Sequence, residues 1–508
     1  MKRNIYDVII SGGGPSGVAF AIELSLHGIK TLVLEKHDEP MYCARAQFLN
    51  PRTMEFMLRW DTCDAMRKKN MLDVSNFMWC SALNGDMYSS VEMHDYHNNH
   101  SPEEMIEIPL WVTEGVLRSR LDKSESVKML KNTAVIEINT SNSDDIIEVK
   151  AENSKTNEIQ EFYAKYVVGC DGANSIVRKS IGINFTKLAS RRRMTNILFE
   201  SSDLFNKIQL DKAAIYFIIN KNHPGVIGPV DPSNNLWYSL FYDDSEMKDI
   251  EHSDISSKLN KMAGFEFEKK LVNATYWNMQ IELADEYSKN NRVFLVGDSA
   301  HSFAPTGGLG LNTAFGDVTN LAWKIAHVIK GKLPESVLST YQQERRSIAY
   351  TNLTKAEENA KALIDLASQI APEEYPQAYA KLSRRHALSA GIGMGYAYFD
   401  SPLVKLHKDQ SLEPMEASKY APKDLPGYFL PNVTLNGKSI YRTLSATDWT
   451  LIVSGGQSDI NIDGVNVIEL PKDTYSSTYI LIRPDWHISY ASNELNIETI
   501  NSLVNSGK

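Results

Sequence analysis

Apolar and polar positions alternate with two different periods near the start of the chain. Residues 8–10 form a short β-branched run that is typical of a buried parallel strand. Residues 18–26 place apolar side chains on one face of a helix, and Gly28 stands where that helix would end. Residues 31–34 predict a second strand, which ends at Glu35. A strand, a helix and a strand in this order predict the beginning of a parallel α/β sheet.

The pattern changes further along the chain and divides it into regions. Residues 75–115 and 185–285 consist of short runs that alternate apolar and polar side chains, which predicts a mixed sheet. Residues 335–395 have the period of helices. After a stretch punctuated by proline and glycine, strand-like runs return, followed by a closing helix; these segments are 449–453, 465–470, 479–482 and 493–503.

Three glycines follow the first predicted strand with the spacing of a nucleotide-binding turn. Gly12, Gly14 and Gly17 give GxGxxG. The first glycine allows a tight turn, the second lets the backbone approach a pyrophosphate, and the third lets the helix pack closely on the strand. The helix N-terminus offers free N–H groups to phosphates, and Glu35 stands where a carboxylate binds ribose hydroxyls. This pattern does not distinguish FAD from NAD.

Two distant segments point to a flavin. Residues 166–178 and 292–317 each begin with a buried-strand run and then place Gly and Asp at its carboxyl end. Ligands bind at that end in open parallel sheets. With these motifs the chain resembles the class A flavoprotein monooxygenases, the group that contains p-hydroxybenzoate hydroxylase and phenol hydroxylase. The resemblance rests on GxGxxG, on Asp171-Gly172 and on Gly297-Asp298, in that order, with support from residues 44–55 and 320–324, and it covers about residues 4–400.

The resemblance implies a role for individual residues. Arg45 would contact the FAD pyrophosphate region, and Asp298 would bind the ribityl chain or the phosphates. Pro305 and the glycine loop at 307–310 would lie against the isoalloxazine ring, where Pro305 and His301 are the candidates for a catalytic role. The predicted cofactor contacts are Gly12, Gly14, Pro15, Ser16, Gly17, Glu35, Lys36, Arg45, Gln47, Arg118, Asp171, Asp298, Gly308, Gly310, Leu311 and Asn312.

Leu311 and Asn312 would open a helix whose N-terminus points at the flavin. Reduced flavin carries negative charge, which free N–H groups and a helix dipole stabilise. One departure from the family is visible before Arg118, where Leu110 to Thr113 lack the glutamine that many members carry. Arg118 is therefore either a cofactor contact or the partner of Glu114 in an i,i+4 salt bridge.

The predicted fold class is α/β, with three domains and a helical connection. A Rossmann-like FAD-binding domain is expected at 1–75, 116–184 and 286–345, interleaved with a mixed-sheet substrate domain. A helical connection and a thioredoxin-like C-terminal domain follow. Their ranges are 76–115 and 185–285 for the substrate domain, 346–405 for the connection and 406–508 for the C-terminal domain. Because no cysteine follows Cys170, that last domain cannot perform dithiol chemistry, and a structural or subunit-contact role is expected.

The resemblance implies an FAD-dependent monooxygenase that consumes NADPH or NADH and O2. The expected reaction is hydroxylation of a phenolic or polycyclic aromatic compound through a flavin C4a-hydroperoxide, with the protein excluding water. Baeyer–Villiger oxidation or epoxidation of a polyketide or antibiotic, and a non-catalytic flavin-binding protein, are the alternatives. Aromatic side chains of the mixed sheet are candidates for the substrate cavity, with ordinary packing as the alternative; they are Tyr216, Trp237 and Tyr238.

Composition argues against several classes of ligand and partner. The 508 residues include 53 Lys and Arg against 63 Asp and Glu, a net charge of −10, which argues against nucleic acid as the principal ligand. No apolar run approaches ~18 residues, so no membrane span is expected. The cysteines form no CxxC pair, so no metal site is predicted and a reducing, cytoplasmic location is expected. A small aromatic substrate and a homodimer are the expected partners.

Overall fold

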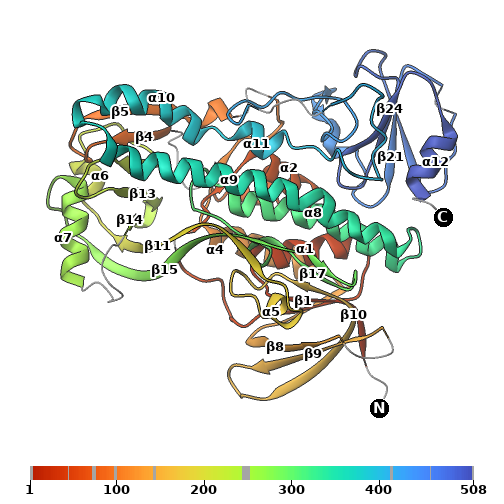
Figure 1. Cartoon of the computed structure of the whole chain (residues 1–508), viewed down its shortest axis with the longest axis horizontal. Helices are drawn as coiled ribbons and strands as arrows, with labels where there is room; N and C mark the ends of the chain where they lie inside the picture. Colours follow the sequence, from red (N-terminus) through yellow and green to blue (C-terminus); the bar gives the residue numbers. More distant parts are fainter. Residues whose placement is uncertain are drawn as a thin grey trace.

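The computed structural model describes residues 4–43, 45–70, 76–96, 100–140, 145–242, 252–411, 416–457 and 459–505. The fold is α/β, with a largely parallel sheet, a second mixed sheet, two long helices that run along the molecule and a small sheet near the C-terminus (Figure 1). Ala44, the first residue of the segment 44–55 noted above, lies outside the described residues.

The first sheet is built on parallel strands that are buried on both faces. Its order is β16-β17-β10-β1-β2-β7, with β9 and β8 attached to β10. Residues 8–10 of β1 have no exposed surface, because helices cover both faces of the sheet. The strands are β1 (Ile5–Ser11), β2 (Thr31–Leu34), β7 (Val127–Leu130), β8 (Thr133–Asn139), β9 (Ile147–Asn153), β10 (Ile159–Gly169), β16 (Ser288–Lys289) and β17 (Val293–Leu295).

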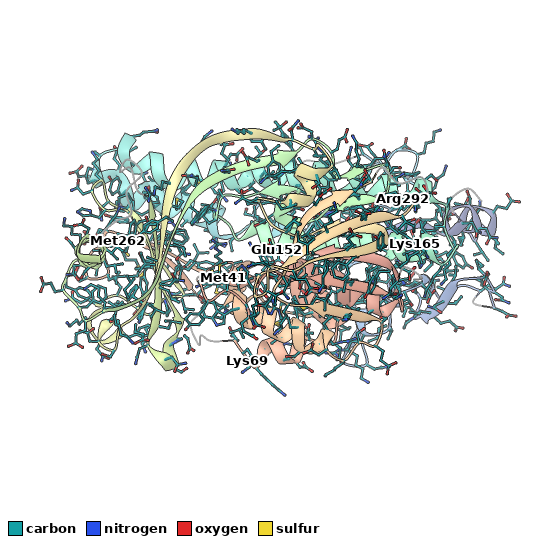
Figure 2. All side chains as sticks on the ribbon, turned by 90° about the horizontal axis from the view of Figure 1, so that it is seen from below. Met41, Lys69, Glu152, Lys165, Met262 and Arg292 are labelled. Atoms are coloured by element: carbon teal, nitrogen blue, oxygen red, sulfur yellow. The ribbon has the colours of Figure 1, made fainter. Side chains whose placement is uncertain are left out.

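The second sheet has the order β18-β15-β11-β14-β13-β12-β4-β5. Its long ribbons β11 and β15 reach from the region around Met262 towards the region of Lys165 and Arg292, so they connect the second sheet with the first (Figure 2). The strands are β4 (Asn76–Cys80), β5 (Met87–Glu92), β11 (Phe185–Glu200), β12 (Ile215–Ile218), β13 (Gly225–Asp231), β14 (Leu236–Tyr242), β15 (Lys270–Ala284) and β18 (His301–Ser302).

The two faces of this second sheet have different neighbours. On the outer face, side chains such as Ile218 and Phe241 pack with α6 (Leu204–Lys207) and α7 (His252–Ala263). On the inner face, Phe77, Trp79 and Phe217 pack with α10 (Tyr375–Ala387) and with Phe48. Because side chains alternate along a strand, the parity of each position decides which face it joins.

Helices cover the first sheet and extend from it towards the second. α1 packs against α4 and α8, and α9 packs along α8. In Figure 1 α8 and α9 run side by side from the second sheet to the C-terminal part. The remaining helices are α1 (Pro15–Leu26), α2 (Pro51–Arg59), α3 (Cys63–Arg67), α4 (Leu110–Leu121), α5 (Ile176–Ser180), α8 (Leu309–Ile329), α9 (Thr340–Gln369), α11 (Ala390–Met394) and α12 (Ile497–Asn505).

Short elements connect these layers. β3 pairs with β6 in an antiparallel ribbon, and β19 pairs with β20. Their bounds, with those of the 3₁₀ helices, are β3 (Phe48–Leu49), β6 (Ile106–Glu107), β19 (Thr434–Leu435), β20 (Lys438–Ser439), η1 (Met93–Tyr96), η2 (Pro232–Asn234), η3 (Gly297–Ser299), η4 (Glu335–Ser339), η5 (Pro372–Glu374) and η6 (Ile440–Arg442).

The C-terminal part is a mixed sheet with the order β22-β21-β23-β24, followed by α12. β21 and β22 are parallel, and the other two pairings are antiparallel. The strands are β21 (Trp449–Ser454), β22 (Val465–Leu470), β23 (Tyr479–Ile482) and β24 (Ile488–Ser492).

Buried charges fasten this C-terminal sheet to the rest of the protein. Arg483, which has no exposed surface, donates to both carboxyl oxygens of Glu344 on α9, at 2.6 and 2.9 Å. Arg59 on α2 donates to the carbonyl oxygen of Pro484 at 2.5 Å. Desolvated, doubly bonded pairs fix geometry, so the C-terminal part is docked rigidly.

The elements depart from the predicted division at three places. α4 crosses the boundary placed at 115/116, and α9 crosses the one at 345/346. β18 pairs with β15 and so joins the second sheet, although 286–345 was assigned to the FAD-binding part. Where a helix continues from one layer into another, the sequence contains no proline- or glycine-rich turn. The sequence therefore does not show where one part ends and the next begins.

Candidate functional site

The glycine loop after β1 is shaped by close contacts within the protein. A Cβ on Gly17 would lie 1.9 Å from the carbonyl oxygen of Gly12, and a Cβ on Gly12, where φ is +99°, would lie 2.4 Å from that of Cys170. A Cβ on Gly14 would meet nothing within 4 Å. Gly12 and Gly17 are therefore required by packing, whereas Gly14 leaves free space beside the start of α1.

The N-terminus of α1 is available to a negatively charged ligand. Gly14 is its N-cap, Pro15 and Ser16 begin the helix, and no side chain of the described residues caps it. The first turn contains no acidic residue. Free N–H groups and the helix dipole thus point out of the protein beside the space at Gly14, as a pyrophosphate requires.

Glu35 and Arg118 hold the other side of this loop. Glu35 accepts hydrogen bonds from the backbone N–H of Gly13 at 2.6 Å and of His37 at 2.7 Å. Arg118 pairs with Glu114 at 2.6 Å and also donates to the carbonyl oxygen of Gly13 at 3.3 Å. Arg118 therefore makes the salt bridge and contacts the loop at the same time. Burial raises the pKa of Glu114 to about 7, although Arg118 opposes that shift. Lys36 is exposed.

The Asp-Gly motif ties the first sheet to the Gly-Asp loop. Asp171 accepts hydrogen bonds from the backbone N–H of Ile176 at 2.8 Å and of Val177 at 3.1 Å, so its carboxylate caps α5. Arg178 on α5 donates to the carbonyl oxygen of Ser299 at 3.2 Å. Burial raises the pKa of Asp171. This motif therefore supports the loop that carries Asp298.

Asp298 belongs to η3 and has an exposed side chain. Desolvation by the surrounding protein nevertheless raises the pKa of its carboxyl. The charges of His301 and Arg45 act on Asp298 in the opposite direction, so all three are neighbours. The structure thus brings Arg45 close to the segment that carries Asp298 and His301.

His301 is fully buried, whereas Asp298 is exposed. The His301 Nε2 lies 2.6 Å from Oδ2 of Asp317 on α8. The other oxygen of Asp317 accepts a hydrogen bond from Nε of Arg345 on α9 at 2.8 Å. Burial alone would raise the pKa of Asp317, but His301 and Arg345 hold it below its ordinary value. Sequence patterns gave Asp317 and Arg345 no role, because their partners lie on other elements.

The second glycine loop leads into α8. Gly308 is the N-cap at a φ of +61°, and the helix begins at Leu309, before Leu311 and Asn312. The Asn312 amide donates to the carbonyl oxygens of Gly308 at 2.6 Å and of Phe48 at 3.1 Å. Asn312 therefore joins the start of α8 to the strand β3. Pro305 and Gly308 are exposed, and Gly310 and Leu311 are half-buried.

The three aromatic candidates of the second sheet lie on different faces. Tyr216 and Trp237 belong to the outer face, and the Tyr216 hydroxyl donates to the carbonyl oxygen of Asp211 at 2.9 Å. Tyr238 belongs to the inner face, where it packs with Leu198 and Trp111. The placement of Tyr216 and Trp237 gives no support to a substrate contact, because packing against α6 and α7 already accounts for them.

The residues present fit a flavin dinucleotide. The two glycine loops and the N-termini of α1 and α8 supply room and N–H groups for a pyrophosphate and for a flat ring. Two buried amides beside the second loop, Gln47 and Asn359, have an Nε2 and an Nδ2 without a hydrogen-bond partner among the described residues. Such donors are the chemistry that flavin carbonyl and ring nitrogen atoms accept.

The described part of the chain shows neither a membrane-spanning helix nor a metal-binding cluster. None of the described helices combines the length and the apolar character that crossing a bilayer needs. Within the same described part of the chain, no group of three or more His, Cys, Asp and Glu side chains is arranged to hold a metal ion.

Comparison with known proteins agrees with this geometry. The family model described as FAD binding domain matches residues 5–356. The FAD-dependent monooxygenase apdD of Emericella nidulans is 25% identical over 556 residues, covering 95% of this chain and 87% of that protein. The 2,4-dichlorophenol 6-monooxygenase of Delftia acidovorans is 26% identical over 427 residues, covering 77% of this chain and 72% of that protein.

A solved structure shows the same fold over the whole chain. The flavin-dependent monooxygenase PieE, in complex with FAD and substrate, superposes with a TM-score of 0.86 at 20% identity, covering 99% of this chain and 98% of that chain. The family match spans more than half of the chain and contains both glycine loops. The chain therefore belongs to the FAD-binding domain family and is an FAD-dependent monooxygenase.

Proposed function

We propose that this enzyme uses NADPH or NADH and O2 to hydroxylate a phenolic or polycyclic aromatic substrate. FAD, when bound, supplies the electron transfer from the nicotinamide to O2 and the transfer of one oxygen atom. The protein's part is to bind the cofactor, hold the aromatic ring against it and exclude water.

The cofactor would lie along the line of the two loops. We assign its pyrophosphate to the N-terminus of α1 at Gly14, Pro15 and Ser16, and its ribose to Glu35. We assign the ribityl chain to Arg45 and Asp298, because the charge of Arg45 acts on the Asp298 carboxyl. The ring would lie against Pro305 and Gly308, with the N-terminus of α8 directed at its polar edge.

The inner face of the second sheet carries the substrate part of the proposal. Phe77, Phe217 and Tyr238 on the inner face keep 7%, 9% and 8% of their surface exposed, although Trp79 on the same face has 0%. We place the substrate next to the first three side chains, between the inner face and the glycine loop at 307–308. Phe48 connects the two, since it contacts Phe77 and lies beside Gly308. Aromatic walls of this kind favour a flat, apolar substrate.

Alternative outcomes use the same cofactor and differ in where the oxygen goes. Baeyer–Villiger oxidation inserts oxygen beside a carbonyl carbon, and epoxidation adds it across a double bond. Hydroxylation is favoured because one of the relatives above is named for its action on a dichlorophenol. A non-catalytic flavin carrier, the other class of function, is not supported by a family of monooxygenases.

The test is anaerobic stopped-flow reduction of the purified holoenzyme by NADPH and by NADH. Phenols, naphthols and polycyclic polyketides are added in turn while the flavin absorbance is followed. We expect one class of ligand to accelerate flavin reduction and, in air, to give a product that contains one ¹⁸O atom from ¹⁸O2. A holoenzyme that neither nicotinamide reduces under any ligand would refute the proposal.

Location and assembly are separate parts of the proposal. We propose that the enzyme acts in the cytoplasm and forms a homodimer. Fractionation of cells that produce the protein tests the first statement, and sedimentation of the holoenzyme tests the second.

A further inference from the structure

Glu107 occupies a special position between the flavin loop and the second sheet. It is the last residue of β6, and its Cα partner on β3 is Phe48. Side chains of directly opposed residues in an antiparallel pair lie on the same face of the ribbon. Phe48 contacts Phe77 with a ring separation of 5.2 Å, so this face of the ribbon is directed at the inner face of the second sheet. Glu107 therefore shares that direction.

Tyr238 confirms this direction from the other side. It lies on the inner face, and the charge of Glu107 raises the pKa of the Tyr238 phenol, after the larger effect of burial. Glu107 and Tyr238 are therefore neighbours. Phe48, the partner of Glu107, lies 3.9 Å from the place a Cβ on Gly308 would take. Glu107 therefore lies on the strand that pairs with β3, and Phe48 of β3 lies beside the loop that we assign to the flavin ring.

The Glu107 carboxyl has no partner of its own in the described part of the chain. It is 3% exposed, and neither carboxyl oxygen has a hydrogen bond there; only its backbone N–H is engaged, with Asn70. Other buried carboxylates are paired with arginine: Glu23 with Arg59, Glu55 with Arg52, Asp317 with Arg345 and Glu344 with Arg483. Burying an unpartnered carboxyl destabilises a protein, so stability does not account for Glu107.

We propose that Glu107 is the specificity-determining residue of the substrate cavity and accepts a hydrogen bond from the phenolic hydroxyl of the aromatic substrate. This proposal rests on the proposed function. The substrate hydroxyl donates to the carboxyl, and this hydrogen bond replaces the one that the phenol made with water. A substrate without a donor leaves the carboxyl unpartnered, so an O-methylated analogue is rejected. Burial raises the pKa of Glu107 well above its ordinary value, which favours the protonated carboxyl.

The experiment compares each phenol with its methyl ether. Phenol and anisole, and 2-naphthol and 2-methoxynaphthalene, are titrated into holoenzyme, and Kd is obtained from the change in flavin absorbance. In the wild type we expect each phenol to bind at least about tenfold more tightly than its ether, as loss of one hydrogen bond to a buried group implies. In Glu107→Leu this ratio falls to about 1, and Glu107→Gln, whose amide oxygen still accepts, keeps part of it.

Glu104→Gln is the matched control, because Glu104 is exposed on the same segment. It should keep the full wild-type ratio. A wild type that binds phenols and ethers equally, or binds none of the four probes, overturns the proposal, as does a Glu107→Leu holoenzyme that keeps the ratio. Infrared difference spectra give a second readout: the band of a protonated carboxyl that is absent from Glu107→Gln should shift when 2-naphthol is added to the wild type. A band that does not move overturns the proposal.

The two proposals fail in different ways. If phenols stimulate NADPH oxidation and Glu107→Leu keeps the hydroxyl preference, only the role of Glu107 is wrong. If the wild type binds phenols with the expected preference and no ligand stimulates NADPH oxidation, the proposed hydroxylation is wrong and the recognition site remains.

Discussion

Nε2 of His301 lies 2.6 Å from Oδ2 of Asp317, and neither side chain has any exposed surface. The same oxygen of Asp317 accepts a hydrogen bond from the backbone N–H of Gly297 at 3.3 Å. One buried carboxylate on α8 therefore holds two points of the loop that carries Asp298. Arg345 on α9 balances its charge, so the geometry of the loop depends on both long helices.

Replacing Asp317 by Asn should destabilise the protein strongly and weaken its hold on FAD. The amide leaves the Arg345 guanidinium buried without a counter-charge, which costs about 3–5 kcal/mol. Thermal unfolding and the Kd for FAD measure the two effects. The control is Glu137→Gln in the surface pair of Glu137 and Lys150, which should change neither. An Asp317→Asn protein with wild-type Tm would contradict this account.

Two glycines of the first loop should respond in opposite ways to alanine. Gly14 has φ −71° and free space around it, so Gly14→Ala should leave the stability of the FAD-free protein unchanged. It should weaken FAD binding by about tenfold or more, since each ~1.4 kcal/mol lost is tenfold. Gly17→Ala places a methyl group against the Gly12 carbonyl and should cost about 1–3 kcal/mol of stability. Urea unfolding measures the stability of each variant, and FAD titration measures its Kd for FAD. Equal losses of stability in the two variants would contradict this prediction.

Local sequence patterns predict much of the fold, but they do not predict contacts between residues that are distant in the sequence. The run at residues 8–10, the glycine spacing and the position of Glu35 all lie within one strand–helix–strand unit, so the sequence predicts them. Asp317 and Glu107 depend on elements distant in the sequence: α9 brings Arg345 to Asp317, and the pairing of β3 with β6 brings Glu107 to Phe48. No period of two or 3.6 residues encodes such contacts.

The three aromatic candidates for the substrate cavity also show what the sequence can and cannot predict. Alternation along a strand places Trp237 and Tyr238 on opposite faces, which the sequence does predict. Which face is directed at the flavin depends on where α7 packs, and that helix covers the face of Trp237 and Tyr216. The choice between the two faces therefore needed the tertiary structure.

Tyr216 and Tyr238 should separate stability from substrate binding when each becomes Phe. The Tyr216 hydroxyl accepts from the backbone N–H of Ala213 at 3.0 Å, so Tyr216→Phe leaves that donor unsatisfied and costs about 1–3 kcal/mol. Its KM for the aromatic substrate should not change. Tyr238→Phe should raise that KM with little change in Tm, if Tyr238 lines the substrate cavity as we propose. If only Tyr216→Phe changes the KM, the substrate cavity lies on the outer face, and its placement on the inner face is wrong.

The stability of the protein should fall with rising pH in a way that depends on Glu107. An unfolded glutamate ionises near pH ~4.3, whereas burial raises the pKa of folded Glu107 well above its ordinary value. Between these two pKa values the folded state binds more protons than the unfolded state, so the free energy of unfolding decreases as pH increases. The contribution of Glu107 is thus fully present at low pH and is lost above the unfolded pKa.

Glutamine at position 107 carries no titrating proton and should remove this contribution. Urea unfolding of wild type and Glu107→Gln at a fixed FAD concentration, from about pH 5 to about pH 8, measures it. We expect the stability of the wild type relative to the variant to be lower at the upper end of this interval than at its lower end. Glu104→Gln, on the exposed part of the same segment, should follow the wild type at every pH. If the curves of stability against pH are parallel for wild type and Glu107→Gln, the carboxyl has a charged partner or water in solution. The proposal that it binds a substrate hydroxyl would then be contradicted.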